Sequence, residues 1–200
     1  MDKTSHPLAT TAAPITAFSQ QAPAWRLLHL GTGRPTIGEA GCLISAIASA
    51  LVDLGVDTDP GRLNAWLTGN HGFWNDNLLI WKAVEGLGVE LTDIIRCEST
   101  PAPLPIITTA LATGRAVLVK LDWRPGGALN QHWVRMTQCD PQPANCQVMD
   151  PWQARGQELI SLERYALPGW GTAQVIFGIA IYARATRAPV SGGKPQIDRD

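Results

Sequence analysis

The apolar residues of the sequence change their spacing about midway along the chain, and this change constrains the fold more than any other feature. In the first half, apolar residues recur at helical spacing after Cys42 until Gly55 ends the run. Two further helices are predicted, over residues 60–69 and 75–88. The first half of the chain is therefore expected to be helical.

The second half consists mainly of short runs typical of strands. These runs contain valine, isoleucine and aromatic residues and are bounded by turn residues. The predicted strands are 89–96, 116–123, 132–138, 146–150 and 173–183, and the one helix among them is 104–114. Helices followed by strands, without alternation of the two, predict an α+β fold in which a helical half packs on an antiparallel sheet.

The size and charge of the chain exclude several classes of partner. Its 200 residues suffice for one domain with a core, and 45% of them are hydrophobic. The net charge of −1 provides no basic surface for nucleic acid. We find neither a signal-peptide core nor a run of about 18 apolar residues. We therefore expect a soluble protein without a membrane span, either cytoplasmic or carried in a virion or a secreted assembly.

Both ends of the chain are predicted to lie outside the folded domain. Residues 1–19 are rich in Thr, Ala and Pro, and residues 184–200 are polar with Gly and Pro. The domain itself is predicted over residues 20–183. Such arms would suit a protein that docks into a larger assembly, for example a phage particle, and this role is one alternative for the function.

Cys42 is the first candidate functional residue. It follows Gly38 and Gly41 and stands at the start of the apolar helix, where unpaired backbone N–H groups and the helix dipole favour a thiolate. The two glycines would leave room for a substrate backbone to approach. The alternative is a structural cysteine that packs as a small hydrophobic side chain.

His132 and Asp150 would complete a catalytic set with Cys42. His132 begins the predicted strand 132–138 and Asp150 ends the strand 146–150, so neighbouring strands would bring the two side chains together. A carboxylate that accepts from one imidazole nitrogen leaves the other to take the thiol proton. Taken singly, His132 fits a satisfied strand histidine, and Asp150 fits the start of an Asp-Pro turn. Nucleophile, base and orienting acid are more specific together than any one alone.

The other cysteines do not indicate a disulfide scaffold or a metal site. Cys139 and Cys146 flank a turn-like segment and would face each other across a hairpin. Reduced thiols are expected for this pair if the protein stays in a reducing compartment. The cysteines and histidines do not have the spacing of a zinc site, so no metal or other cofactor is predicted.

Eight tryptophans are many for a chain of this length. Those in the loops around Trp74, Trp123 and Trp170 would line an extended cleft for a peptide or a sugar, and the simpler alternative, which we favour, is ordinary packing. The segment 123–127 is predicted to form a mobile lip in front of His132.

Three blocks of the sequence carry a resemblance to a known family. They are SQQAPAWRLLHLG with TIGEAGCLISAIASAL, then QHWVRMTQCD, then CQVMDPW. Over about residues 20–152 they resemble the papain-like cysteine peptidases of the bacteriocin-processing type, the double-glycine leader peptidases and their stand-alone relatives. The resemblance implies a papain-like fold in which Cys42 is the nucleophile, His132 the base and Asp150 the residue that orients the base.

The same resemblance implies a glutamine that donates to the oxyanion. Gln20 matches this position and Gln21 is the close alternative, because Ala22 stands where relatives usually have Asp. The implied activity is hydrolysis of a peptide or peptidoglycan amide bond, and it needs no cofactor. Acyl transfer by the same triad and a structural role in an assembly stay open as alternatives.

Overall fold

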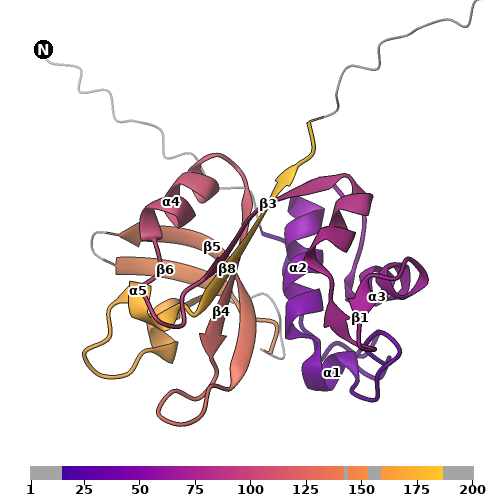
Figure 1. The fold of residues 1–200 in the computed structure, drawn as a ribbon, viewed down its shortest axis with the longest axis horizontal. Coiled ribbons are helices and arrows are strands. Elements are labelled where there is room, and N and C mark those ends of the chain that lie inside the picture. The colour runs from indigo at the N-terminus through magenta and orange to yellow at the C-terminus, as the bar shows by residue number, and fades with distance from the viewer. Residues whose placement is uncertain (1–14, 142–143, 153–158, 187–200) are drawn as a thin grey trace, which may run out of the picture.

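The described residues form a helical half and a sheet half that lie side by side (Figure 1). The structure is a computed structural model and describes residues 15–141, 144–152 and 159–186. The first part of the chain is helical and the later part forms an antiparallel sheet, which confirms the predicted α+β fold. Within the described residues, no helix is both long enough and apolar enough to cross a membrane.

The helical half is built around one long helix. Its elements, in chain order, are α1 (Ile37–Ala40), α2 (Cys42–Asp53), α3 (Pro60–Gly69), the hairpin of β1 (Phe73–Trp74) and β2 (Leu78–Leu79), and the 3₁₀ helix η1 (Trp81–Leu87). The predicted helix 60–69 is confirmed as α3. Its start is fixed by Asp59, which accepts a hydrogen bond from the Arg62 N–H at 2.9 Å, and by Pro60 in the first turn.

The helix α2 lies at the centre of the molecule. Every residue from Ile44 to Leu51 is buried. A helix that is apolar on all sides has to lie inside a protein rather than on its surface. It packs against β4 and β5 of the sheet and against α3. Because Cys42 opens this helix, the burial of α2 also fixes the place of Cys42.

In the part of the chain that the structure describes, the sheet half contains six antiparallel strands. Their order across the sheet is β3 (Val89–Arg96), β8 (Gly178–Arg184), β4 (Ala116–Asp122), β5 (Gln131–Pro141), β6 (Ala144–Met149) and β7 (Leu159–Ser161). The helices of this half are α4 (Leu104–Ala112), η2 (Leu162–Tyr165) and α5 (Thr172–Val175). The last predicted strand therefore begins later than expected, at Gly178, because a short helical turn precedes it.

Both faces of the sheet are apolar because helices cover each of them. Along β4, Leu118 packs in the core shared with α2, whereas Val117 and Val119 belong to the core on the opposite face, under α4. Successive side chains of a strand point to opposite faces, so a strand covered on both sides is a nearly continuous apolar run. This explains the apolar character of the run 116–123 in the sequence.

The prediction of a helix over residues 75–88 is wrong. Its first part is the tip of the β1–β2 hairpin, where Asn75 and Asp76 have φ angles of 48° and 71°. Asn and Asp tolerate this left-handed conformation better than other residues with a side chain. The Asp76 carbonyl accepts a hydrogen bond from the Thr32 N–H at 2.9 Å, so a neighbouring loop holds the tip in place. Only the later part of the segment is helical, as η1.

Cys139 and Cys146 form a disulfide between β5 and β6. The two residues are direct partners in the strand register, so their side chains project from the same face of the hairpin. The expectation that they face each other is confirmed, whereas the expectation of reduced thiols is wrong for this structure.

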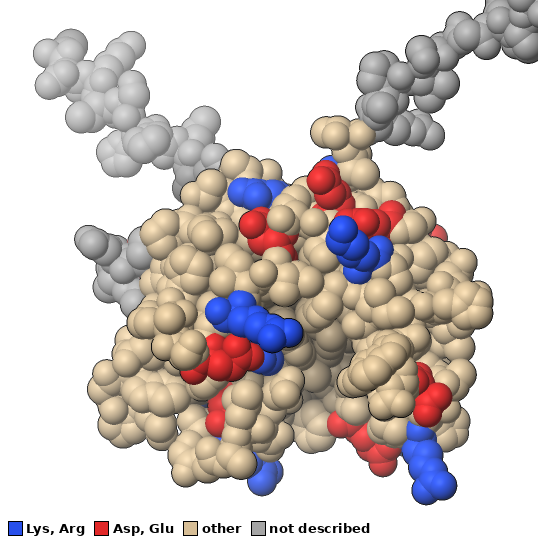
Figure 2. Space-filling view, in the orientation of Figure 1, with Lys and Arg blue, Asp and Glu red and all other residues tan. Residues whose placement is uncertain are grey.

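Charged side chains of both signs are interspersed over the face that Figure 2 shows, with uncharged surface between them. Among the exposed ion pairs of the described residues is that of Arg62 with Asp57, whose nitrogen and oxygen atoms are 3.0 Å apart. A surface of alternating sign exerts little long-range attraction on a charged partner.

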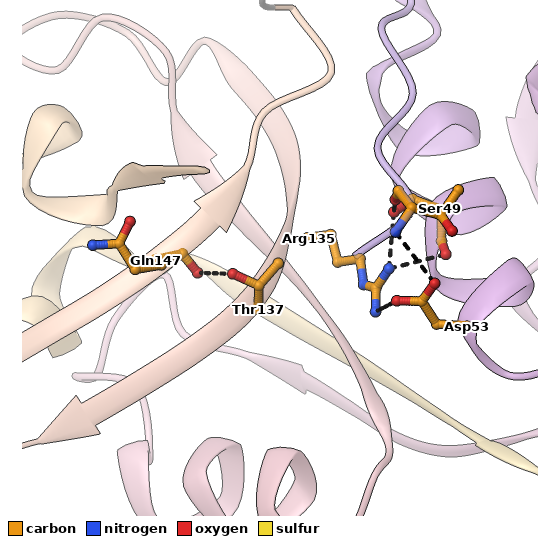
Figure 3. A network of polar contacts seen from close by, with 6 residues as sticks. Ser49, Asp53, Arg135, Thr137 and Gln147 are labelled. Carbon is orange, nitrogen blue, oxygen red and sulfur yellow. Dashed lines mark hydrogen bonds and ion pairs between the residues drawn. The ribbon is translucent and has the colours of Figure 1, made fainter. Parts of the chain in front are cut away.

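One buried arginine joins the two halves of the molecule (Figure 3). Arg135, on β5, donates through Nη1 to the carbonyl and the hydroxyl of Ser49, both at 2.9 Å, and through Nη2 to Asp53 Oδ2 at 2.7 Å. Ser49 and Asp53 lie on α2. The same two residues bind Thr16, since the Ser49 hydroxyl donates to its carbonyl and Asp53 Oδ1 accepts from its N–H at 3.3 Å.

Thr16 lies within the predicted N-terminal arm of residues 1–19. This part of the arm is thus in contact with α2 through Thr16, while residues 1–14 lie outside the described residues. Residues 187–200 of the predicted C-terminal tail also lie outside them. The domain boundaries stay a prediction.

We expect Arg135→Met to lower the free energy of unfolding by about 2–4 kcal/mol. The substitution leaves Asp53 and the buried Ser49 groups without their donor. The matched control is Arg115→Met, because Arg115 makes a more exposed ion pair with Asp93 at 3.8 Å, for which we expect a loss of about 0–1 kcal/mol. Urea unfolding of both variants measures the difference. Equal losses would contradict a special role for the Arg135 network.

Candidate active site

Cys42 occupies the first position of α2, and the preceding turn sets its orientation. The short helix α1 begins with a capping box, in which the Thr36 hydroxyl accepts from the Glu39 N–H and Glu39 Oε2 accepts from the Thr36 N–H at 2.8 Å. The Gly41 N–H donates to the Ile37 carbonyl at 2.7 Å and joins α1 to α2. At the start of a helix the backbone N–H groups lack intrahelical acceptors, so they can donate to an acceptor that binds beside the thiol.

The two glycines before Cys42 serve the packing of the chain itself. A Cβ atom at Gly38 would lie 2.8 Å from the Arg26 carbonyl oxygen, and one at Gly41 would lie 2.4 Å from that of Ile37. Both distances are too short for a real side chain. The expectation that these glycines leave room for a substrate is therefore wrong, because the protein's own backbone occupies that space.

His132 and Asp150 are joined in a buried hydrogen bond. His132 is the second residue of β5, and Asp150 directly follows β6, the neighbouring antiparallel strand. His132 Nε2 lies 2.6 Å from Asp150 Oδ1, and the two residues are only 4% and 1% exposed. The sequence-based expectation that neighbouring strands bring these two side chains together holds. Because Nε2 is used by the carboxylate, Nδ1 is the ring nitrogen left for a thiol.

Asp150 is held by further donors. Its Oδ2 accepts from the Tyr165 hydroxyl at 2.6 Å and its Oδ1 from the Trp152 N–H at 2.9 Å. The backbone bond to Trp152 is the Asp-Pro turn that the sequence suggested as the ordinary role of Asp150, so the residue has both roles. Tyr165, in η2, was missed from the sequence because a single tyrosine in a short helical turn carries no motif.

The charges of the site favour a protonated imidazole. Burial lowers the pKa of His132, but the hydrogen bonds and charge interactions of its ring with Asp150 and Cys42 outweigh burial and raise this pKa to about 9. Burial likewise raises the pKa of Asp150, and its hydrogen bonds from His132 and Tyr165 more than compensate, so the pKa lies below its usual value. At neutral pH the buried pair is thus an imidazolium and a carboxylate.

Gln20, the predicted oxyanion donor, borders the same site. Its backbone N–H donates to the Pro151 carbonyl at 2.8 Å, and its Nε2 donates to the Gly38 carbonyl at 2.9 Å. The side chain is 1% exposed and lines the cavity that also contains Cys42 and His132. Gln21 donates to the same Gly38 carbonyl at 2.6 Å but does not line this cavity. The structure therefore brings Gln20, rather than Gln21, to the site.

This first cavity has a volume of about 470 Å³ and an aromatic wall. The Trp123 ring meets the His132 ring edge-on with their centroids 4.5 Å apart, and Trp152 packs on Trp123 at 5.0 Å. Trp123 thus lines the cleft as expected, together with Trp152, whereas Trp74 and Trp170 do not line it. The Trp123 ring thus lies directly against the imidazole of His132.

The loop after Trp123 is tied to the end of β4. Asp122 Oδ1 accepts from the N–H groups of Arg124 and Asn130, at 3.0 and 3.1 Å. The Trp123 N–H also donates to the Asn130 carbonyl at 2.8 Å. The predicted lip in front of His132 is therefore a loop closed at its base by three hydrogen bonds.

A comparison with solved structures finds a similar fold in a candidate C39-like peptidase from Bacillus anthracis. The two structures superpose with a TM-score of 0.52 over 86% of this chain and 96% of the other, at 11% sequence identity. Searches against family models and against curated proteins find no match. At so low an identity the likeness shows the fold alone, which is that of the C39-like, papain-like peptidases.

We expect Tyr165→Phe to destabilise the protein in a pH-dependent way. The low pKa of Asp150 in the folded state gives stability that is present above its unfolded pKa and lost as the pH falls through the folded pKa. Because Tyr165 stabilises the charged carboxylate, its loss should cost about 1.5–3 kcal/mol at pH 7 and less near pH 3. Denaturant unfolding at a series of pH values measures this cost.

Tyr182→Phe is the matched control for this experiment. The Tyr182 hydroxyl donates to a neutral acceptor, the Trp81 carbonyl, at 2.8 Å. Its removal should cost about 0.5–1.5 kcal/mol, with the same value at each pH. If the two variants showed the same pH dependence, the bond from Tyr165 would have no special effect on the charge of Asp150.

Proposed function

We propose that the protein is a thiol hydrolase, a stand-alone relative of the bacteriocin-processing peptidases that cleaves a peptide or peptidoglycan amide bond. Cys42 is the nucleophile, His132 the base and Asp150 the residue that orients the base. The observation that carries the proposal is the 2.6 Å bond between His132 and Asp150, buried beneath a cavity that also contains the Cys42 thiol. This is a nucleophile, base and orienting acid in hydrogen-bonding order.

The reaction begins with the thiolate of Cys42. Its sulfur attacks the amide carbonyl carbon, and the carbonyl electron pair moves to the oxygen. The resulting oxyanion accepts from the Cys42 backbone N–H and from the Gln20 carboxamide. Gln20 Nε2 donates to the Gly38 carbonyl at 2.9 Å and, by a longer bond of 3.5 Å, to the Ile37 carbonyl, and the N–H of this longer bond turns to the oxyanion. Imidazolium Nδ1–H of His132 protonates the leaving amine, and the C–N bond breaks.

Water then completes the cycle. His132, now neutral, takes a proton from a water molecule that attacks the thioester carbonyl, and the Cys42 thiolate leaves as the carboxylic acid forms. If an amine took the place of water, the same steps would give acyl transfer. No metal or organic cofactor enters this scheme.

The first test is the rate at which Cys42 is alkylated. We expect iodoacetamide to label Cys42 at pH 6.5 roughly tenfold to a hundredfold faster than an ordinary thiol, because a thiol with a pKa of about 8.5 is only about 1% ionised there. His132→Ala should remove this advantage. Cys97 is an internal control, since it is buried and burial raises the pKa of its thiol. Slow labelling at Cys42 that is indifferent to His132 would overturn the proposal.

The charge of His132 gives the pH profile of the same experiment. Because its pKa is raised to about 9, the imidazolium persists below that pH and is lost above it. An anionic reagent is attracted by this cation and a neutral one is not. The ratio of the iodoacetate rate to the iodoacetamide rate should therefore fall as the pH rises through about 9, and in His132→Ala the ratio should stay flat.

The role of Gln20 can be separated from that of Gln21 by two kinds of reagent. We expect Gln20→Ala to slow acylation of Cys42 by a p-nitrophenyl ester or an amide by about 10²–10³, because one oxyanion donor is lost. Alkylation by iodoacetamide forms no oxyanion, so its rate should change little. Gln21→Ala is the matched control and should affect neither rate. A larger effect of Gln21→Ala on acylation would move the oxyanion donor to Gln21.

Product analysis distinguishes the alternatives that share this fold. Muropeptides and peptide mixtures are incubated with the protein, with and without hydroxylamine, and the products are identified by mass spectrometry. New carboxylate ends indicate hydrolysis, and a preference for hydroxamates indicates acyl transfer. Selective labelling of Cys42 without turnover of any substrate would favour a structural component of an assembly.

A further inference from the structure

A second cavity meets the first at Cys42. Its volume is about 240 Å³, and Ala40, Cys42 and Gln131 line both cavities. Its walls are otherwise mainly apolar and come from both halves of the molecule. The main apolar side chains around it are Leu43, Ile44, Phe73, Leu78, Leu79 and Trp133.

The walls of this second cavity are held in place by the fold. Phe73 and Leu79 are direct partners in the β1–β2 hairpin, whose tip is fixed by the bond from the Thr32 N–H to the Asp76 carbonyl. On the opposite side, the Trp133 ring packs edge-on against Trp81 with their centroids 5.0 Å apart. The cavity is therefore formed before a ligand arrives, which lowers the cost of binding.

The geometry of the reaction decides which part of a substrate faces this cavity. The attacked carbon carries four groups: the Cys42 sulfur, the oxyanion, the leaving amine and the acyl chain. The oxyanion must meet Gln20 and the amine must meet His132, and both of these residues line the first cavity and not the second. The acyl chain is left to extend over the second cavity.

We infer that the second cavity is the binding site for a bulky apolar side chain on the acyl side of the scissile bond, an inference that rests on the proposed hydrolase function. An apolar cavity of about 150 Å³ is large enough to bind benzene, so the space here admits a leucine or phenylalanine side chain. Asn77 and Gln131 are the polar side chains of its lining besides Cys42. A charged side chain would therefore lose its water without gaining a partner of opposite charge.

This inference separates the protein from a peptidase that selects a double glycine. Two glycines in front of the scissile bond would leave the cavity empty and its apolar walls in contact with water. A leucine or phenylalanine would cover Leu43, Phe73, Leu79 and Trp133, which are only partly buried in the free protein. The substrate class is thus a peptide with a large apolar residue close to the cleaved bond on its acyl side.

The test uses peptidyl fluoromethyl ketones, which place a peptide on the acyl side only. The thiolate of Cys42 displaces fluoride, so a C–S bond forms as the C–F bond breaks. Two series, acetyl-X-Gly and acetyl-Gly-X, are compared with X as Gly, Leu, Phe, Asp or Lys. In one of the two series we expect the reagents with X as Leu or Phe to label Cys42 about tenfold or more faster than the reagent with X as Gly. The reagents with X as Asp or Lys should be no faster than the one with Gly.

Leu78 and Trp74 provide matched variants of the full-length protein. They are direct partners in the hairpin and are 50% and 67% exposed, but only Leu78 lines the second cavity. Each labelling rate is first divided by the rate at which iodoacetamide labels the same variant. In Leu78→Lys, the reagent with X as Leu should then lose its advantage over the reagent with X as Gly, and the reagent with X as Asp should react faster than it does with the wild type. Trp74→Lys should leave the ratios as in the wild type.

The outcomes separate this inference from the proposed function. Equal rates for Gly, Leu and Asp in both series, with iodoacetamide labelling still dependent on His132, would overturn the apolar subsite and leave the hydrolase intact. A preference for Asp or Lys in the wild type would do the same. Iodoacetamide labelling that does not depend on His132 would overturn the hydrolase and the subsite together.

Discussion

The burial of one helix is the constraint on which the rest of this structure depends. α2 is apolar on all sides, so it can be stable only between other elements, and the sheet half and α3 provide its surroundings. Arg135 then fixes how α2 lies against β5, because its guanidinium binds two successive turns of the helix at Ser49 and Asp53. The first residue of that helix is Cys42. The position of the thiol beside β5 therefore follows from packing and from one buried ion pair.

The polar part of the site is assembled in a different way. His132 and Asp150 belong to neighbouring strands, and their contact needs only the register of the β5–β6 pair and the turn after β6. Tyr165 and the Trp152 N–H stabilise the carboxylate, and the Trp123 ring covers the imidazole. His132, Asp150 and Tyr165 are all buried, so their charges and dipoles interact more strongly than they would at the surface. Gln20 joins this unit through its backbone bond to Pro151.

The sequence allowed the fold class and the meeting of His132 with Asp150 to be predicted, because both follow from local pattern and strand order. The helical run after Cys42 and the apolar strand 116–123 have a clear period. The hairpin at Asn75 and Asp76 could not be predicted, since the Thr32 loop that holds it is distant in the chain. The purpose of Gly38 was misjudged for the same reason, because Arg26 fills the space beside it.

The β5–β6 hairpin has the proposed base, His132, and the proposed orienting acid, Asp150, near one end and the Cys139–Cys146 disulfide near the other. The proposed base and acid therefore both belong to the sheet half, while the proposed nucleophile, Cys42, belongs to the helical half. A displacement of one half against the other would change the separation of Cys42 from His132 and leave the His132–Asp150 bond intact. The boundary between the two halves is thus also the boundary between the proposed attacking group and the groups proposed to move the proton.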